Sequence, residues 1–246
     1  MNPIFARLPV SVFEVMSALA REHEAVNLGQ GFPDDPGPED VRRKAAEAVI
    51  AGWNQYPPML GIPELRHAIA AHYRHWQGLV FDPEREVMVT SGATEALAGA
   101  LMALIEPGDE VVLFQPLYDA YLPLVLRAGG VPRLVRLEPP HWRFDEELLT
   151  RAFSHKTKVV LFNNPLNPSG TVYAADDLTL LARFCMQFDA IAVCDEGPSF
   201  PPTFDPATSG GLGLKIVSSL AGAAGAEAIA VDRSVPFGRI VVRMAL

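Results

Sequence analysis

The order of hydrophobic and polar residues divides the chain into two regimes that meet near residue 86. Before this point, apolar residues recur at helical spacing over 11–23, 38–51 and 62–76, and segments rich in glycine and proline lie between these stretches. After it, short apolar runs alternate with helical patterns. Strands are predicted at 87–90, 111–114, 131–137, 158–162 and 190–194, and helices at 93–105, 118–128, 145–153 and 174–188. This alternation predicts an α/β domain with a mainly parallel sheet covered on both faces.

The amino-acid composition of the chain changes again after Glu196. Residues 197–213 are dense in proline, glycine, serine and threonine, and a helix is predicted from 214 to 224. Two strand-like runs follow, at 227–233 and 238–244, which we expect to pair as a hairpin. Because this change is the sharpest in the chain, we predict a domain boundary near residue 196.

Composition narrows the classes of function. The chain has 246 residues, 49% of them hydrophobic, and a net charge of −9, with its basic residues scattered. Nucleic acid and membrane surfaces are therefore not expected as partners. The two cysteines, Cys185 and Cys194, have neither metal-ligand spacing nor a disulfide framework. No apolar run reaches membrane-spanning length, and no secretory signal is evident, so we expect a cytoplasmic protein without a metal site.

Polar residues follow two of the predicted strands. The strand at 158–162 leads into the asparagine-rich loop 163–170, and the strand at 190–194 ends in Asp195. If these strands are neighbours in a parallel sheet, the loop and the carboxylate meet at the edge where such sheets bind ligands. The alternative is an ordinary turn and an aspartate that caps the next helix.

Two further strand ends carry suggestive residues. Small residues at 91–94 precede a helix, where free backbone N–H groups and the helix dipole attract anions. Tyr118 follows the strand at 111–114 and could stack on a flat ligand. Taken singly, these features also fit a Ser/Thr-capped helix and a core tyrosine. In combination with the asparagine loop and Asp195, they match the needs of pyridoxal 5′-phosphate: a phosphate anchor, a stacking ring, a donor to the phenolic oxygen and an acid facing the pyridine nitrogen.

Four motifs make the resemblance specific: NLGQGFPD at 27–34, NQYPP at 54–58, TSGATEA at 90–96 and NPLNPSG at 164–170. Together they resemble class I/II aminotransferases of fold type I, in the branch of the kynurenine and methionine aminotransferases. The resemblance covers residues 1 to about 196. It implies an N-terminal segment at 1–50, a large domain at 51–196 with an incomplete three-layer sheet, and pyridoxal phosphate as cofactor. It also implies a homodimer that moves an amino group from an L-amino acid to a 2-oxo acid.

The resemblance implies roles for seven residues. Two would meet the cofactor phosphate, one would stack on its ring, and one each would bind its phenolic oxygen and its pyridine nitrogen. Another would contact the substrate carboxylate, and the last would reach the phosphate held by a dimer partner. In that order the residues are Ala93 and Thr94, Tyr118, Asn167, Asp195, Gly31 and Tyr56.

The chain departs from this family after Glu196. Where the family has a tyrosine that also bonds the phenolic oxygen, this chain has Gly197 and Pro198. A Ser-x-Ser-Lys motif, whose lysine bonds the cofactor covalently, and a later substrate-binding arginine are both missing. Of the lysines present, only Lys215 follows Asp195, and it is the candidate substitute. We therefore expect this chain alone to transfer amino groups very slowly or not at all.

The tail has a resemblance of its own. DEGPS at 195–199, GGLGLKIV at 210–217 and the closing hairpin resemble the end of a sensor histidine kinase ATP-binding domain, although Ser199 replaces a usual glycine. VCDE at 193–196 suits both families, which suggests a junction of two coding sequences there. Three hypotheses follow: an aminotransferase, a non-catalytic protein that binds pyridoxal phosphate, and an ATP-binding fragment.

Overall fold

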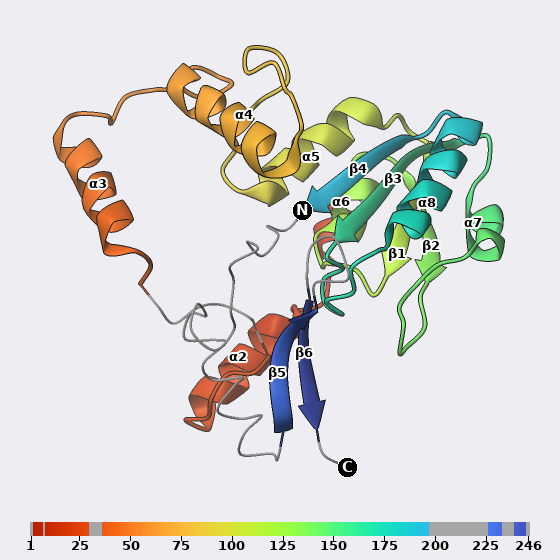
Figure 1. Ribbon diagram of the computed structural model, residues 1–246. Helices are drawn as coiled ribbons and strands as arrows, with labels where there is room; N and C mark the ends of the chain where they lie inside the picture. Colours follow the sequence, from red (N-terminus) through yellow and green to blue (C-terminus); the bar gives the residue numbers. More distant parts are fainter. Residues whose placement is uncertain (1, 7, 30–35, 197–225, 233–238, 245–246) are drawn as a thin grey trace. The chain divides into compact units, whose positions relative to one another are not determined.

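The structure is a computed structural model that describes residues 2–6, 8–29, 36–196, 226–232 and 239–244 (Figure 1). Its contacts define two units. One consists of residues 36–100, and the other combines residues 1–35 with residues 101–246. Among the residues described, none of the helices combines the length and apolar character needed to cross a bilayer.

The smaller unit contains α3 (Glu39–Ile50), α4 (Pro63–Gln77) and the first turns of α5 (Ala93–Leu104). Helix α4 shows why the sequence folds in this way. Pro63 occupies its first turn, where no backbone N–H is required, and Gly78 ends it with a φ of 69° that suits glycine. The helices predicted at 38–51, 62–76 and 93–105 are confirmed.

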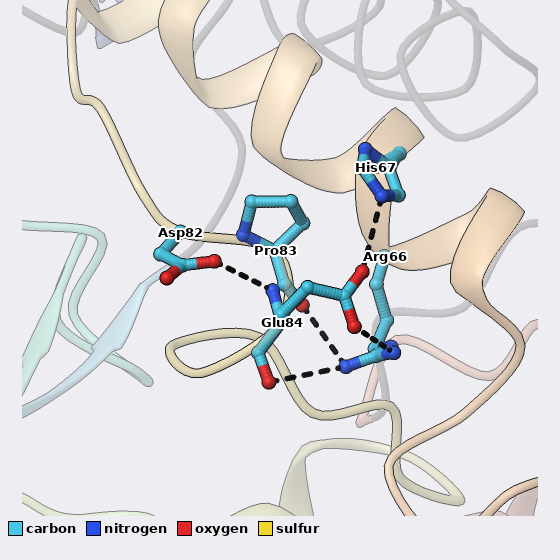
Figure 2. A network of polar contacts seen from close by, with 5 residues as sticks. All are labelled: Arg66, His67, Asp82, Pro83 and Glu84. Atoms are coloured by element: carbon cyan, nitrogen blue, oxygen red, sulfur yellow. Dashed lines mark hydrogen bonds and ion pairs between the residues drawn. The ribbon is translucent and has the colours of Figure 1, made fainter.

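A buried arginine joins α4 to the loop that follows it (Figure 2). The Arg66 side chain donates to the carbonyl oxygen of Pro83 at 3.0 Å and to the Glu84 carboxylate at 2.9 Å. The other carboxylate oxygen of Glu84 lies 3.1 Å from Nε2 of the exposed His67. Arg66 is only 6% exposed, and a buried charge requires such partners. These contacts hold the loop against the helix.

The strand predicted at 87–90 is wrong, because these residues form no strand. Val87 is buried, and the Val89 N–H donates to the Leu60 carbonyl at 3.0 Å, but no ladder forms. A Cβ at Gly61, whose φ is 94°, would lie 2.7 Å from the Val89 side chain, so the segment packs closely on glycine. A β-favouring sequence becomes a strand only beside a partner, and the part of the chain that the structure describes contains none for it.

The larger unit is built on a four-stranded parallel sheet. Its strands are β1 (Glu110–Gln115), β2 (Val131–Arg136), β3 (Thr157–Asn164) and β4 (Ile191–Glu196), in the order β2-β1-β3-β4. Strands β1 and β3 lie inside and are almost wholly buried, which explains their continuous apolar runs. The predicted α/β fold class is confirmed.

One face of the sheet packs on α7 (Glu146–Ala152) and α8 (Ala175–Phe188). Val112, Phe114 and Val160 belong to the same buried cluster as residues of these two helices. Because side chains alternate along a strand, the intervening residues of β1 and β3 face the opposite way. The cluster is the larger part of the core and contains most of its aromatic side chains.

Helix α6 (Tyr121–Arg127) covers the other face. A Cβ at Gly130 would lie 3.0 Å from Val125 Cγ1 and 3.2 Å from Val111 Cγ2, so these two valines approach the same backbone. The expected layers of helix, sheet and helix are therefore present. Helix α6 begins three residues later than the helix predicted at 118–128, because Tyr118 and its two successors form a turn.

Glu110 secures the amino end of the sheet. It is buried, its carboxylate accepts a hydrogen bond from Arg133 of β2, and it accepts another from Ser154 Oγ at 2.6 Å. The Arg133 hydrogen bond is the main reason that the pKa of Glu110 is lowered, against the effect of its burial. One carboxylate thus joins β1, β2 and the turn before β3.

Two outer parts complete the described chain. Residues 11–23 form the expected helix, α2 (Val12–Glu22), after the single turn α1 (Pro3–Ala6). The Ser11 Oγ accepts the Phe13 N–H at 3.3 Å and caps α2. Strands β5 (Ala226–Asp232) and β6 (Arg239–Met244) pair antiparallel, which confirms the predicted hairpin. The helix predicted at 214–224 lies outside the described residues, and the boundary near residue 196 stays a prediction.

Tyr173 provides a test of this core. It is fully buried against the stacked rings of Phe114 and Phe144, and among the described residues its hydroxyl has no hydrogen-bond partner. Because an unpaired buried hydroxyl costs free energy, Tyr173→Phe should raise the free energy of unfolding by about 1 kcal/mol in urea titrations. Tyr56→Phe, at a residue that is 98% exposed, should change it by less than about 0.5 kcal/mol. A clear loss of stability in Tyr173→Phe would contradict this account of the core.

Candidate functional site

The sheet has a point at which its connections diverge. After β1 the chain passes through α6 to β2 at one edge, whereas after β3 it passes through α8 to β4 at the other. Because β1 and β3 are neighbours, the connections that follow them lead to opposite edges of the sheet. Open α/β sheets bind ligands at such switch points. The residues that follow β1, β3 and β4 at this end therefore form the candidate site.

Asp195, near the end of β4, is held by a tyrosine. The Tyr121 hydroxyl donates to Asp195 Oδ2 at 2.5 Å, and Tyr121 is only 3% exposed. Burial raises the pKa of Tyr121 far above its ordinary value, and the hydrogen bond to Asp195 raises it further, so the phenol remains a donor. Within the described residues, the other carboxylate oxygen of Asp195 has no hydrogen-bond partner and is available to a ligand.

Asn163 fixes the position of two neighbours. It lies opposite Asp195 in the β3–β4 register, and its Nδ2 donates to the Asp195 carbonyl oxygen at 2.6 Å. Its Oδ1 accepts the backbone N–H of Asn167. Asn163 is buried, so this one amide joins the acid-bearing strand to the loop after β3.

The loop after β3 is held in shape by its own contacts. The side chain of buried Asn164 accepts the Tyr173 N–H at 3.1 Å. Leu166 donates its N–H to the Thr171 carbonyl at 2.8 Å, which closes the loop. Asn167 lies between these contacts with an exposed side chain that makes no hydrogen bond to the described residues. The backbone of Asn167 is therefore held in place, while its side-chain amide makes no hydrogen bond within the described part of the chain.

Tyr118 lies in the turn after β1 and is half-buried. Its ring meets the Tyr121 ring edge to face, with centroids 5.6 Å apart and planes at 77°. The carboxylate of the next residue, Asp119, accepts a hydrogen bond from Ser11 Oγ at the start of α2. The N-terminal segment is thereby joined to the turn that contains Tyr118.

The start of α5 belongs to the other unit and has its own features. Ser91 to Thr94 are exposed, and Gly92 has a φ of 84° at which a side chain would be strained. Glu95 turns back so that its carboxylate accepts the Ser91 N–H. A carboxylate at this position indicates that the start of this 12-residue helix attracts negative charge.

The structure brings together only part of the expected set. Tyr118, Asn167 and Asp195 are linked through Tyr121 and Asn163 at one end of the sheet. Ala93, Thr94 and Tyr56 belong to the other unit, and all three are exposed. Gly31, Lys215 and the glycine-rich run at 210–217 lie outside the described residues.

Sequence reasoning missed Tyr121 and the specific role of Asn163. Tyr121 follows Tyr118 by three residues, a spacing at which side chains of a helical turn meet, and this was the available signal. Asn163 ends the buried run of β3, where a polar side chain needs a partner.

The two asparagines of this site should respond differently to truncation. Asn163→Ala leaves the partly buried Asp195 carbonyl and Asn167 N–H without their hydrogen-bond partner, so the free energy of unfolding should fall by about 2 kcal/mol. Asn167→Ala removes an exposed side chain without a protein partner, so the change should stay within about 0.5 kcal/mol. Urea denaturation of both variants measures the difference, and equal losses would refute the assignment of Asn163 as the structural residue.

Comparisons with known proteins identify the family of the chain. Residues 23–197 match the family model described as aminotransferase class I and II. The methionine aminotransferase of Escherichia coli is 40% identical over 200 residues, which are 79% of this chain and 52% of the relative. Human kynurenine–oxoglutarate transaminase 1 is 38% identical over 192 residues, which are 72% of this chain and 45% of the relative.

A solved structure of an aminotransferase is also similar to this chain. N-succinyldiaminopimelate aminotransferase from Mycobacterium tuberculosis superposes with a TM-score of 0.76 at 42% identity, over 79% of this chain and 51% of that chain. The chain thus spans about half the length of the curated relatives it matches. From the family model, the relatives and the shared fold, the chain belongs to the class I and II aminotransferases.

Proposed function

We propose that this chain holds pyridoxal 5′-phosphate as the cofactor-binding part of an aminotransferase that moves an amino group from an L-amino acid to a 2-oxo acid. Pyridoxal phosphate is the cofactor of this family. The observation that carries the proposal is the Asp195 carboxylate at a switch point of the sheet: Oδ2 accepts a hydrogen bond from Tyr121, and Oδ1 has no hydrogen-bond partner among the described residues.

The donor set at this end of the sheet fits that cofactor. Asp195 would face the pyridine nitrogen, Asn167 would donate to the phenolic oxygen, and Tyr118 would lie against the ring. When bound, the cofactor withdraws electrons from the α-carbon of the substrate, and it does so more strongly with its nitrogen protonated. The residues supply what this requires: a carboxylate for the positive nitrogen, an exposed amide and a supported aromatic ring.

The phosphate and substrate contacts extend the same proposal. The exposed start of α5 offers backbone N–H groups and the Thr94 hydroxyl to an anion. We assign the phosphate to Ala93 and Thr94, and the substrate carboxylate to Gly31. Tyr56 is 98% exposed, which suits a residue that reaches the phosphate of a second subunit in a homodimer.

Covalent attachment of the cofactor is a separate question. Lys156 and Lys158 lie at the amino end of β3, and ~17 Å of strand separates Lys158 from Asn163, beyond the reach of a lysine side chain. Neither lysine can therefore take part at the carboxyl end. Lys215 remains the candidate substitute, and we propose that this chain alone binds the cofactor with slow or no amino transfer.

The names of the relatives indicate the substrate class. Among the related proteins are a methionine aminotransferase and a kynurenine–oxoglutarate transaminase. We propose an aromatic or sulfur-containing L-amino acid as donor and a 2-oxo acid as acceptor for a complete enzyme with this site.

The proposed binding can be measured by titrating the purified chain with pyridoxal phosphate and following its absorbance. Asp195→Asn removes a charge-assisted contact to the pyridine nitrogen, so the dissociation constant should rise about tenfold. Asp176→Asn makes the same chemical change at an exposed residue in the first turn of α8 and should leave affinity unaltered. Equal affinity of the wild type and Asp195→Asn would sink the proposal.

A second measurement tests Lys215. The chain is incubated with pyridoxal phosphate, reduced with borohydride and mapped by mass spectrometry. Stoichiometric label on Lys215 that disappears in Lys215→Arg would identify a working nucleophile. We expect instead no stoichiometric label at any of the four lysines, in line with reversible binding.

A further inference from the structure

Tyr121 contacts two residues of the candidate site although we assign it no contact with the cofactor. Tyr121 lies on the first turn of α6 and is almost entirely buried next to Asp195 and Tyr118. Its hydroxyl holds Asp195 Oδ2 at 2.5 Å, and its ring meets the ring of Tyr118. One side chain therefore touches both the acid and the aromatic of the candidate site.

We propose that Tyr121 is a positioning residue that sets the orientation of the Asp195 carboxylate and the Tyr118 ring toward one bound pyridoxal phosphate. The inference rests on the proposed function, because it assumes that these two residues face the cofactor. It goes beyond that function by assigning the geometry of both contacts to a residue behind them.

The carboxylate of an aspartate can rotate about its side-chain bonds unless a partner holds it. The Asn163 amide fixes the backbone of Asp195 through its carbonyl oxygen, but the side chain can still rotate. The phenol of Tyr121 removes that freedom by binding Oδ2, which leaves Oδ1 as the oxygen without a hydrogen bond to the described residues. Because the phenol cannot move within its buried setting, the direction of Oδ1 is fixed before any ligand arrives.

Tyr121 also restricts the orientation of the Tyr118 ring. Tyr118 is half-buried, so its ring would otherwise adapt to whatever lies beside it. The edge-to-face contact with Tyr121, with planes at 77°, favours one ring orientation. The direction of the acid and the plane of the stacking ring are thus set by the same side chain.

The test compares two tyrosines that lose the same atom. Tyr121→Phe keeps the ring and deletes the hydroxyl that holds Asp195. Tyr173→Phe deletes a buried hydroxyl that has no partner among the described residues and lies in the α8-side core. Both variants and the wild type are titrated with pyridoxal phosphate, and urea denaturation shows that each is folded.

Three readouts are taken with the cofactor bound: the dissociation constant, the induced circular dichroism per bound cofactor, and the chemical shift of an isotopically labelled pyridine nitrogen. In Tyr121→Phe we expect about tenfold weaker binding, smaller induced dichroism and a shift of the labelled nitrogen toward its unprotonated resonance. Tyr173→Phe should match the wild type in all three. A variant that is merely less stable would lose affinity without changing the spectrum of the molecules that still bind.

The result separates the two proposals. If the wild type binds and Asp195→Asn weakens binding, but Tyr121→Phe leaves all three readouts unchanged, the positioning role is overturned and the proposed function stands. If the wild type does not bind, or Asp195→Asn binds equally well, the proposed function itself has failed. If Tyr121→Phe does not fold, Tyr121→Met removes the same hydroxyl without adding volume or a donor, and wild-type readouts from it would likewise overturn the role.

Discussion

The burial of β3 between β1 and β4 is the constraint on which the rest of this unit depends. A strand with neighbours on both edges and helices over its faces can contain almost nothing but apolar side chains. Its polar residues are therefore confined to its ends: Thr157 and Lys158 where it enters the sheet, and two asparagines where it leaves the sheet. Asn163 and Asn164 stand at that point, and each satisfies backbone groups of a neighbouring segment. The site is thus a consequence of the same burial that stabilises the sheet.

The two buried tyrosines, Tyr121 and Tyr173, have different roles in this fold. Tyr173 contributes area to an aromatic cluster, and its hydroxyl gains nothing from the described residues. Tyr121 contributes a hydrogen bond whose value depends on the acid beside it. Burial raises the pKa of both hydroxyls, so both remain neutral, but only one is given an acceptor. The difference lies in their positions: Tyr173 belongs to the hydrophobic core cluster, whereas Tyr121 lies beside Asp195 near the carboxyl end of β4.

Much of this could be predicted from the sequence, for identifiable reasons. The strands at 111–114, 158–162 and 190–194 were predictable because their apolar runs lie between turn signals, and the helix at 174–188 because its apolar positions repeat. The strand predicted at 87–90 does not form, because a strand there needs a partner, and local sequence does not show whether one is present. Asp195 and Asn167 could be named from motifs, whereas Tyr121 could not. Its contact with Asp195 spans 74 positions of the chain and arises only when α6 and β4 fold together.

The position of β4 in the sheet has a consequence for handling the protein. Among the strands that the structure describes, β4 pairs only with β3, and Ile191 at its start is 40% exposed. Its outer edge therefore presents a row of backbone donors and acceptors to any extended peptide, including another molecule of the same chain. Asp195 thus lies on one of the two edge strands of the described sheet, β2 being the other. Self-association should therefore increase with protein concentration. It should also increase with ionic strength, because salt screens the repulsion between the negative charges near the end of β4 in different molecules.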